Sequence, residues 1–520
     1  LPAPICGRPR GLATIHASAL VGLDAYPIRV EVCATRGPAF FQMVGLAEAA
    51  VREARVRVAS ALARLGVLLD EHAITVNLAP ADLRKSGAAL DLAIAVGVLG
   101  AVGELDPLVC HDTLLLGELS LEGRLQAIRG VLPQLDGARA RGLAQAVVPA
   151  GNAAEAGLVT GLPVFVAAEL QEVCAHLAGR QELPRAPRTP FSPTEGAAGL
   201  DLAEIRGQGS ARRALEVAAA GNHNLLMVGP PGGGKTLLAR VLPTILPALT
   251  FAEALEATAI QSVAGLVDPE RGVVTTRPFR APHHSVSDAG LVGGGDVPRP
   301  GEVSLAHHGV LFLDELAEFR RSALEALRQP LEDGRVCISR ARARAWFPAR
   351  PLVVAAVNPC PCGYWGHPLR RCRCSPVQRR RYLARLSGPL LDRIDVHVSV
   401  PPVDVRSLAA AAPGESSAAV RARVLAARER QRERQRRGEV AHATNAALSL
   451  AELDQVAALD REGRALVDRA VRQLGLSARA YVRVLRVARS VADLEAAATV
   501  RAPHVAEAVQ GRLLEAEGLG

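Results

Sequence analysis

The sequence is poor in lysine, although it has 520 residues and 61 basic ones: only Lys85 and Lys235 are lysine, and every other basic residue is arginine. It has no long hydrophobic run, because the longest uncharged apolar stretch, residues 92–103, is well short of the roughly 20 residues that a membrane-spanning helix needs. The first residues lack the basic-then-apolar order of a signal peptide. We therefore expect a cytoplasmic chain without membrane contact. Its length predicts two to four domains, since one core usually serves about 100–200 residues.

The nine cysteines are odd in number and unevenly spread, which is not typical of a secreted disulfide framework. Four of them, Cys360, Cys362, Cys372 and Cys374, form a compact group that could supply four thiolates to a tetrahedral Zn²⁺ ion. The C-x-C spacing is tighter than usual, so unmetallated thiols remain an alternative. His367 lies between the two pairs and could replace one cysteine.

The formal net charge of +9 is concentrated in two segments. Residues 370–393 hold eight arginines and one aspartate, and residues 421–437 hold eight arginines and two glutamates. Local basic clusters of this kind are typical of surfaces that face a polyanion, and next to the cysteines this indicates a nucleic-acid or phosphate role. The alternative for 421–437 is a solvated helix rich in Arg and Gln.

The chain divides by pattern into an α/β domain at 1–183, a proline-rich linker at 184–198, a second α/β domain at 199–402 and a helical region at 403–520. In the first domain a helix is expected from Glu48 to Leu65, and strands are expected at 28–32, 73–78, 113–116, 146–148 and 164–166.

A nucleotide site is predicted where the apolar strand 225–228 meets a glycine-rich loop and then a helical segment. The loop has the pattern G-x-x-x-x-G-K-T, whose backbone N–H groups converge on phosphate at a helix N-terminus. In this pattern Lys235 reaches the β- and γ-phosphates and the Thr236 hydroxyl ligates Mg²⁺. The predicted nucleotide-binding residues are Gly229, Pro230, Pro231, Gly232, Gly233, Gly234, Lys235 and Thr236.

Two further strands end in polar residues. The apolar run 310–313 leads into Asp314 and Glu315, which are predicted to hold the Mg²⁺ water shell and to polarise the attacking water. The run 353–357 leads into Asn358, which could orient that water or could simply begin a turn. AAA+ ATPases have these three features in the same order: a strand before the phosphate loop, a strand before Asp-Glu and a strand before Asn. The cofactors expected are ATP and Mg²⁺.

Longer motifs resemble the YifB/ComM family of magnesium-chelatase-like AAA+ ATPases. They lie at 44–46, 48–53, 75–83, 277–285, 287–289, 293–295, 298–307 and 358–363. The resemblance implies a homo-hexameric ring and a relation to magnesium-chelatase ATPase subunits and MCM helicases; ComM proteins are associated with DNA branch migration during natural transformation. It also implies that Arg393 is an arginine finger acting on the neighbouring subunit, and that Arg479 is a sensor on the same phosphate. For each arginine the alternative is a salt bridge.

The resemblance also implies that the Gly- and Pro-rich segment 290–301 lies where this clade inserts hairpins that face the ring pore. Such a loop could contact DNA or could merely be flexible. The preceding His283 and His284 are not expected to bind a metal, because no carboxylate or cysteine lies at supporting spacing.

The N-terminal domain resembles the ChlI-type domain, which is similar in fold to the Lon protease domain. Aligned with the Lon catalytic segments, this chain has Ala89 in place of the nucleophilic serine and Gln126 in place of the lysine, so acyl transfer is not expected. Ser86, beside Lys85, is the one residual hydroxyl to consider. Three functions follow: a hexameric DNA motor first, a chelatase-type ATPase that remodels a protein partner second, and an ATP-dependent protease as the least favoured.

Overall fold

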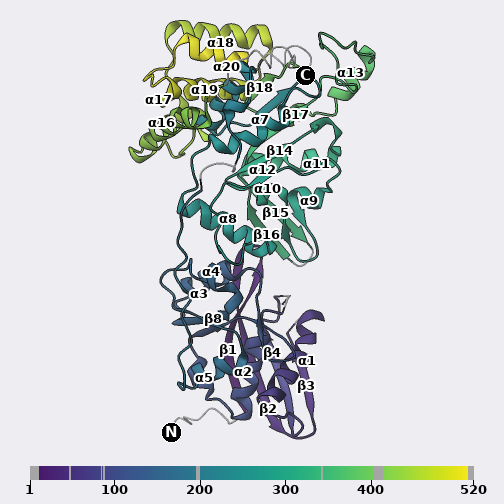
Figure 1. The fold of residues 1–520 in the computed structure, drawn as a ribbon, viewed down its shortest axis with the longest axis vertical. Coiled ribbons are helices and arrows are strands. Elements are labelled where there is room, and N and C mark those ends of the chain that lie inside the picture. Colours follow the sequence, from purple (N-terminus) through teal and green to yellow (C-terminus); the bar gives the residue numbers. More distant parts are fainter. Residues whose placement is uncertain are drawn as a thin grey trace, which may run out of the picture.

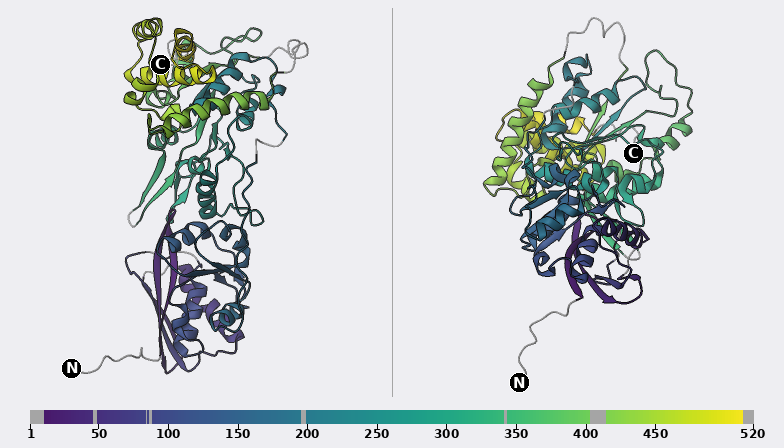
Figure 2. Two further views of the ribbon diagram at one scale, coloured as in Figure 1. Left: turned by 90° about the vertical axis from the view of Figure 1, so that its left-hand side faces the viewer. Right: turned by 60° about the horizontal axis from the view of Figure 1, so that its bottom comes forward.

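The computed structural model describes residues 11–45, 49–83, 85, 88–194, 199–340, 343–402 and 414–512. The molecule is elongated, with the N-terminal α/β domain at one end and a second α/β domain topped by helices at the other (Figure 1). Views from two other directions show the same division (Figure 2). Ser86, Glu48, the end of the expected linker (195–198) and the start of the helical region (403–413) lie outside the described residues.

A seven-stranded sheet with the order β3-β4-β2-β1-β5-β8-β9 forms the N-terminal domain. All five expected strands are confirmed, and β1 and β3 are additional strands of the sheet. Strand β1 was not predicted because polar Thr, His and Ser side chains alternate with buried Ala and Ile, which weakens the apolar pattern. The strands are β1 (Leu12–Val21), β2 (Asp24–Arg36), β3 (Phe40–Val44), β4 (His72–Ala79), β5 (Thr113–Leu115), β8 (Gln145–Pro149) and β9 (Val164–Ala167), with β6 (Glu118–Leu119) and β7 (Leu125–Gln126) paired separately.

The long apolar run of the sequence is the buried helix α2 (Asp91–Val102), which packs against β1 and β2. Its residues from Asp91 to Ala101 are all buried, which explains why the run has no polar face. The expected helix after 48 is confirmed as α1 (Ala49–Arg64). The domain is completed by α3 (Val131–Ala140), α4 (Ala153–Ala156) and α5 (Leu170–Leu177).

The second domain is built on a five-stranded parallel sheet with the order β11-β14-β17-β10-β18. Its central strands β10 (Leu225–Val228), β14 (Val310–Leu313) and β17 (Leu352–Val357) are almost wholly apolar and buried, as expected for parallel strands covered on both faces. The edge strands β11 (Phe279–Arg280) and β18 (Val396–Ser399) are short and are absent from the sequence-based expectations. Because the strands are parallel, their carboxyl ends meet at one edge of the sheet, where ligands of such folds bind.

Helices and two hairpins surround this sheet. The segment 290–301 forms the end of α9 and a hairpin of β12 (Gly293–Gly294) with β13 (Arg299–Pro300), and a longer hairpin pairs β15 (Arg335–Arg340) with β16 (Ala343–Pro348). The helices are α6 (Gly209–Gly221), α7 (Lys235–Val241), α8 (Phe251–Ala264), α9 (Asp288–Val292), α10 (Glu302–Leu305), α11 (Arg321–Ala326), α12 (Arg328–Asp333), α13 (Pro376–Leu383) and α14 (Gly388–Leu391).

The described C-terminal residues are helical, as expected, and share one apolar core with the parallel sheet through α6. They form α16 (Ser417–Arg436), α17 (Leu450–Val456), α18 (Arg461–Leu474), α19 (Ala478–Leu494) and α20 (Ala502–Gln510). No helix in the described part of the chain is long and apolar enough to cross a membrane.

The arginines of α16 bear on the two alternatives left open for residues 421–437. Arg428 is buried and donates to the carbonyl of Ala219, while Arg434 forms a bidentate pair with the buried Asp493. Several outward-facing arginines pair with glutamates of the same helix. Residues 421–437 are therefore mainly a packing helix, and the expectation of a polyanion-binding surface there is not supported.

The N-terminal domain rests on the second domain at two places. The Glu155 carboxylate accepts hydrogen bonds from the Leu132 N–H (2.8 Å) and from the Ser262 hydroxyl of α8. The tip of the β1–β2 hairpin, with Val21 and Leu23, packs into the apolar cluster that includes the β15–β16 hairpin. The two domains are thus joined through α8 and the longer hairpin.

Candidate active site

The phosphate-binding loop joins β10 to α7, in the strand–loop–helix context that the sequence predicts. Gly232 and Gly234 have φ values of +80° and +84°, in the left-handed region that favours glycine. At Gly229 a Cβ atom would lie 2.0 Å from the carbonyl oxygen of Val400, so no side chain fits there. The three glycines therefore allow the tight turn.

Lys235 is buried at the first position of α7 and lies among backbone carbonyl groups. Its Nζ donates to the oxygens of Gly229 (2.6 Å) and Pro230 (2.9 Å) and to Oδ1 of Asn358 (3.1 Å). Burial lowers the pKa of Lys235, which the charges of Asp314 and Glu315 oppose. The structure thus brings Asn358 into hydrogen-bonding contact with the lysine of the predicted phosphate loop.

Thr236 and Asp314 form the candidate magnesium site. The Thr236 hydroxyl donates to Oδ2 of Asp314 at 2.9 Å, and Oδ1 of the same carboxylate accepts the N–H of Glu315 at 2.9 Å. Magnesium prefers hard oxygen ligands and keeps several waters, so a hydroxyl and a carboxylate at a solvent-accessible strand end fit it.

Glu315 follows Asp314 in a left-handed conformation, with φ of +51°. Its side chain is half exposed, and its Oε2 lies 3.4 Å from Nδ1 of His284. Sequence reasoning missed this contact. The contact follows from the strand order of the sheet. Strands β11 and β14 pair in parallel, so the residues that follow them lie near each other.

The two predicted phosphate-sensing arginines both influence the carboxylate of Glu332. Arg393 donates to the carbonyl oxygen of Pro389 (2.6 Å) and pairs with the carboxylate of Glu332 on α12. Arg479 is exposed near the start of α19. The hydrogen bond from Arg393 lowers the pKa of Glu332, and the charge of Arg479 contributes.

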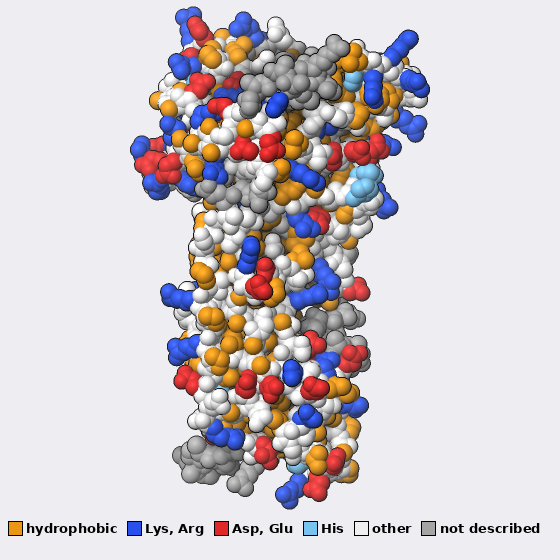
Figure 3. All heavy atoms as spheres, viewed as in Figure 1, with side chains coloured by type: hydrophobic (Ala, Val, Ile, Leu, Met, Phe, Trp, Pro, Cys, Tyr) orange, Lys and Arg blue, Asp and Glu red, His pale blue; other side chains and the backbone are white. Residues whose placement is uncertain are grey.

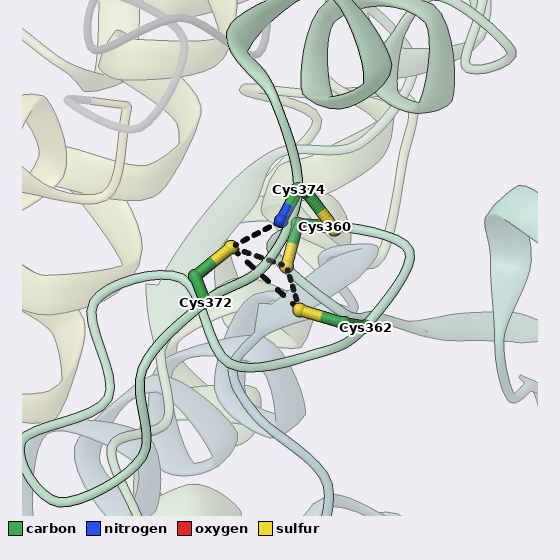
Figure 4. A group of neighbouring side chains, drawn as sticks. All are labelled: Cys360, Cys362, Cys372 and Cys374. Carbon is green, nitrogen blue, oxygen red and sulfur yellow. Dashed lines mark hydrogen bonds between the residues drawn. The ribbon is translucent and has the colours of Figure 1, made fainter.

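The four predicted cysteines are brought together in the loop between β17 and α13 (Figure 4). The Sγ atoms of Cys360, Cys362 and Cys372 lie 3.4–3.7 Å apart, and Cys374 Sγ is within 4.8 Å of them. His367 is engaged elsewhere, because its Nδ1 accepts the backbone N–H groups of Leu369 and Arg370.

A second group of possible ligands, Glu256, His307 and His308, is better explained as a hydrogen-bonded cluster. The Nε2 atoms of both histidines lie within 3 Å of the Glu256 carboxylate. Nδ1 of His307 accepts the N–H of Arg350 at 3.0 Å, so the proton of the neutral ring is on Nε2. A metal-ligating histidine instead donates its second N–H to an acceptor. The group therefore does not have the form of a metal site.

The protease alternative finds no support in the described residues of the N-terminal domain, which do not include Ser86. Ala89 offers only its carbonyl oxygen, which accepts the N–H of Gly117, and Gln126 is exposed on β7. Lys85 is buried with its Nζ donating to the carbonyl oxygens of Gly45 (3.0 Å) and Pro80. It therefore ties the end of β3 to the end of β4.

Comparison with known proteins identifies relatives along nearly the whole chain. Family models described as subunit ChlI of Mg-chelatase, magnesium chelatase subunit ChlI, and the ChlI C-terminal region match residues 30–152, 201–408 and 414–512. The chain is 44% identical over 507 residues to the YifB protein of Salmonella typhimurium, which covers 97% of both chains. It is 44% identical over 509 residues to the competence protein ComM of Haemophilus influenzae, covering 97% of this chain and 98% of that protein. A shorter similarity, 30% identity over 151 residues, is to Lon protease 2 of Bacillus subtilis.

Proposed function

Because the chain belongs to the YifB/ComM family of magnesium-chelatase-like AAA+ ATPases, we propose that it is a magnesium-dependent ATPase that works on DNA as a hexameric ring motor. The observation that carries the ATPase part is the convergence of the phosphate loop, the Asp-Glu strand end and Asn358 at one edge of the parallel sheet. These groups come from three strands far apart in the sequence, and an AAA+ site needs all of them.

Within one subunit, the loop N–H groups and Lys235 bind the β- and γ-phosphates, and the lysine exchanges its carbonyl partners for phosphate oxygens. Thr236 and Asp314 would hold Mg²⁺, which would neutralise charge on the phosphates. Glu315 accepts a proton from the attacking water, and Asn358 orients that water. The position of each side chain at the sheet edge and the chemistry of its polar group support these roles.

The neighbouring subunit completes the site in this proposal. Arg393 pairs with Glu332 on α12, and the charge of Arg479 also acts on that carboxylate. A planar guanidinium stabilises the charge of a transferring phosphoryl group. Both arginines would therefore act across a subunit interface, and Arg393 must leave Glu332 to do so.

The DNA part of the proposal is supported by the arginine-rich segment 370–393 and by the similarity to a protein named for competence. An ATP-dependent motor with reduced cysteines fits the cytoplasm, and we include that location in the proposal.

The second candidate is a chelatase-type ATPase that remodels a protein partner. It is favoured by the family models, all three of which are described by the magnesium-chelatase subunit ChlI. In such a subunit the Arg-rich, Cys-containing stretch 360–393 would have no evident role.

Steady-state ATP hydrolysis separates the two. We expect Mg²⁺-dependent hydrolysis that forked or single-stranded DNA stimulates several-fold at low salt and less at moderate salt. The Lys235→Ala variant, with the same DNA, controls for contaminating ATPases. Hydrolysis that is indifferent to every DNA tested would favour the protein-remodelling function.

A further inference from the structure

The N-terminal domain has a cavity of about 370 Å³ between its sheet and the chain that follows α3. This volume lies within the range of about 300–1,000 Å³ that is usual for small-molecule sites. All of the described residues that line the cavity belong to the N-terminal domain, so the ATP site of the second domain does not use it.

One side of the cavity is a row of residues across β1, β2 and β4. His16 lies opposite Arg29 in the antiparallel pair of β1 and β2, and Arg29 lies opposite Ala79 in the pair of β2 and β4. Residues that lie opposite each other in such pairs point to the same face of the sheet, so the register brings the imidazole and the guanidinium to one side. Arg141, at the C-terminal end of α3, lines the same cavity.

The ionisable groups that line this cavity are all basic. They are His16, Arg29 and Arg141, and none of the described lining residues is acidic. On the face of the N-terminal domain that Figure 3 shows, Lys and Arg side chains are interspersed with Asp and Glu. A cavity with charge of one sign is therefore a local feature, and general basicity of the domain does not explain it.

The two guanidinium groups of the cavity have little to neutralise them. Arg141 donates to the neutral carbonyl oxygen of Ala25 (3.2 Å), and no carboxylate among the described residues pairs with it. Arg29 approaches the Glu31 carboxylate only to 3.9 Å, while that carboxylate accepts a shorter hydrogen bond from Asn77 (2.8 Å). Because a guanidinium has five N–H donors, donors remain for a ligand.

The surroundings of these groups disfavour their positive charge. Burial lowers the pKa of Arg141. Burial also lowers the pKa of His16, and the charges of His111 and Arg141 lower it further, against the opposing charge of Asp112. A bound anion would offset these effects, because a nearby opposite charge favours the protonated form of a base.

A phosphate group suits this arrangement better than a carboxylate does. The donors come from two strands of the sheet and from the end of a helix, and a phosphate offers three acceptor oxygens in different directions. A water molecule takes about 30 Å³, so inorganic phosphate alone would fill only part of the cavity. The remaining walls are apolar and consist of Ala17, Pro27, Ala79, Pro80 and Leu143.

We propose that this cavity binds a small organic molecule through a phosphate group. Arg29, Arg141 and His16 contact the phosphate oxygens, and the apolar walls contact the organic part. The proposal gives the N-terminal domain a ligand-binding role that does not depend on the proposed DNA motor.

Calorimetric titration with phenyl phosphate tests the site. The full-length chain carries Lys235→Ala throughout, so that the phosphate loop does not compete for the probe. We expect saturable binding of one probe per chain, which Arg141→Ala weakens about tenfold or more because charge-assisted hydrogen bonds are lost. Arg139→Ala is the matched control and should keep the affinity, since Arg139 is in the last turn of the same helix but pairs with Asp136 (2.5 Å).

Further probes and variants define which parts of the ligand are recognised. Inorganic phosphate should bind more weakly than phenyl phosphate, and phenol, which lacks the phosphate, should not bind. Arg29→Gln, on the opposite side of the cavity from the helix end, should also weaken binding. Arg141→Lys should bind better than Arg141→Ala, because it keeps a cation at the same place.

Lack of saturable binding up to about 10 mM phenyl phosphate would overturn the site. Equal affinities of the Arg141→Ala and Arg139→Ala chains would do the same, and a lowered Tm with unchanged binding would show that Arg141 serves only to end α3. Inorganic phosphate that binds as tightly as phenyl phosphate would overturn the organic part of the ligand. An oligonucleotide that displaces phenyl phosphate at a lower concentration than any small phosphate would show that a nucleic-acid backbone occupies the cavity instead.

Discussion

The two lysines of this arginine-rich chain are both buried, and each donates mainly to backbone carbonyl groups. Burial lowers the pKa of Lys85 and of Lys235. An ammonium group is compact and donates in three directions, whereas a guanidinium is a wide planar fork. That difference gives a physical reason for lysine at both positions.

Replacing Lys235 should stop catalysis without unfolding the protein. We expect Lys235→Ala to lower kcat for ATP hydrolysis about 10²–10³-fold, since it removes a cation aimed at the phosphates. Lys235→Arg should be similarly impaired, because the pocket of carbonyl groups fits an ammonium. The matched variant Lys85→Met should lower Tm instead and keep hydrolysis per folded chain. Residual activity within tenfold of the wild type in Lys235→Ala would contradict the assignment.

His284 offers a second test at the scale of a residue. Its Nδ1 lies 3.4 Å from Oε2 of Glu315, near enough to influence where that carboxylate lies. We expect His284→Ala to raise basal hydrolysis a few-fold and to reduce the ratio of stimulation by DNA. The neighbouring His283→Ala serves as control, since His283 bonds Ser285 instead. Equal basal rates and equal stimulation in the two variants would show that His284 has no influence on Glu315.

Among the elements, the edge strand β18 and the residue just before it carry two buried ionisable groups, His397 and Asp395. Burial and the charge of Arg512 lower the pKa of His397 to about 3. Asp395, just before the strand, accepts hydrogen bonds from Arg483 of α19 (2.5 Å) and from the N–H of Asn224 (3.1 Å). This strand therefore joins the helical region to the parallel sheet.

The shifted pKa of His397 makes stability depend on pH. Between about pH 6.5 and pH 3 the unfolded chain binds a proton at this residue and the folded chain does not, so the free energy of unfolding falls as the pH falls. The loss amounts to about 1.4 kcal/mol per pH unit once the pH is well below 6.5. Urea denaturation at pH 7, 6 and 5 should show a shallower decline for His397→Leu. Parallel declines for the two proteins would contradict the lowered pKa.

The elements also show what sequence patterns can and cannot predict. Strands β10, β14 and β17 and the loop that follows β10 are predictable because a buried parallel strand is a continuous apolar run. Strand β11 has two residues, which leaves no measurable pattern. Arg434 pairs with Asp493, and Glu315 lies near His284. Such pairings come from tertiary packing, which no local pattern encodes.

At the scale of the whole molecule, the predicted ATP site lies at one edge of the parallel sheet, and Arg393 lies elsewhere, paired with Glu332. The N-terminal domain contacts α8 and the β15–β16 hairpin, so movement of the nucleotide domain would be transmitted to it. The position of Arg393 supports the proposed action between subunits, and the domain contacts support coupling within one chain.

Mixing two inactive variants tests the action between subunits. Arg393→Ala should bind ATP and hydrolyse almost none, and Lys235→Ala should be inactive but still carry Arg393. We expect mixtures of the two to recover part of the wild-type rate, because a Lys235→Ala subunit can supply the arginine to a neighbour with an intact phosphate loop. No recovery from subunits that assemble together would contradict a role for Arg393 in the neighbouring site.

Strand displacement from a labelled forked DNA shows whether ATP hydrolysis drives movement on DNA, as the proposed motor requires. We expect the wild-type chain to release the strand with Mg²⁺ and ATP, but not with a non-hydrolysable ATP analogue. The Lys235→Ala variant should release none. A wild-type chain that hydrolyses ATP on the fork but never displaces the strand or a DNA branch would contradict the motor.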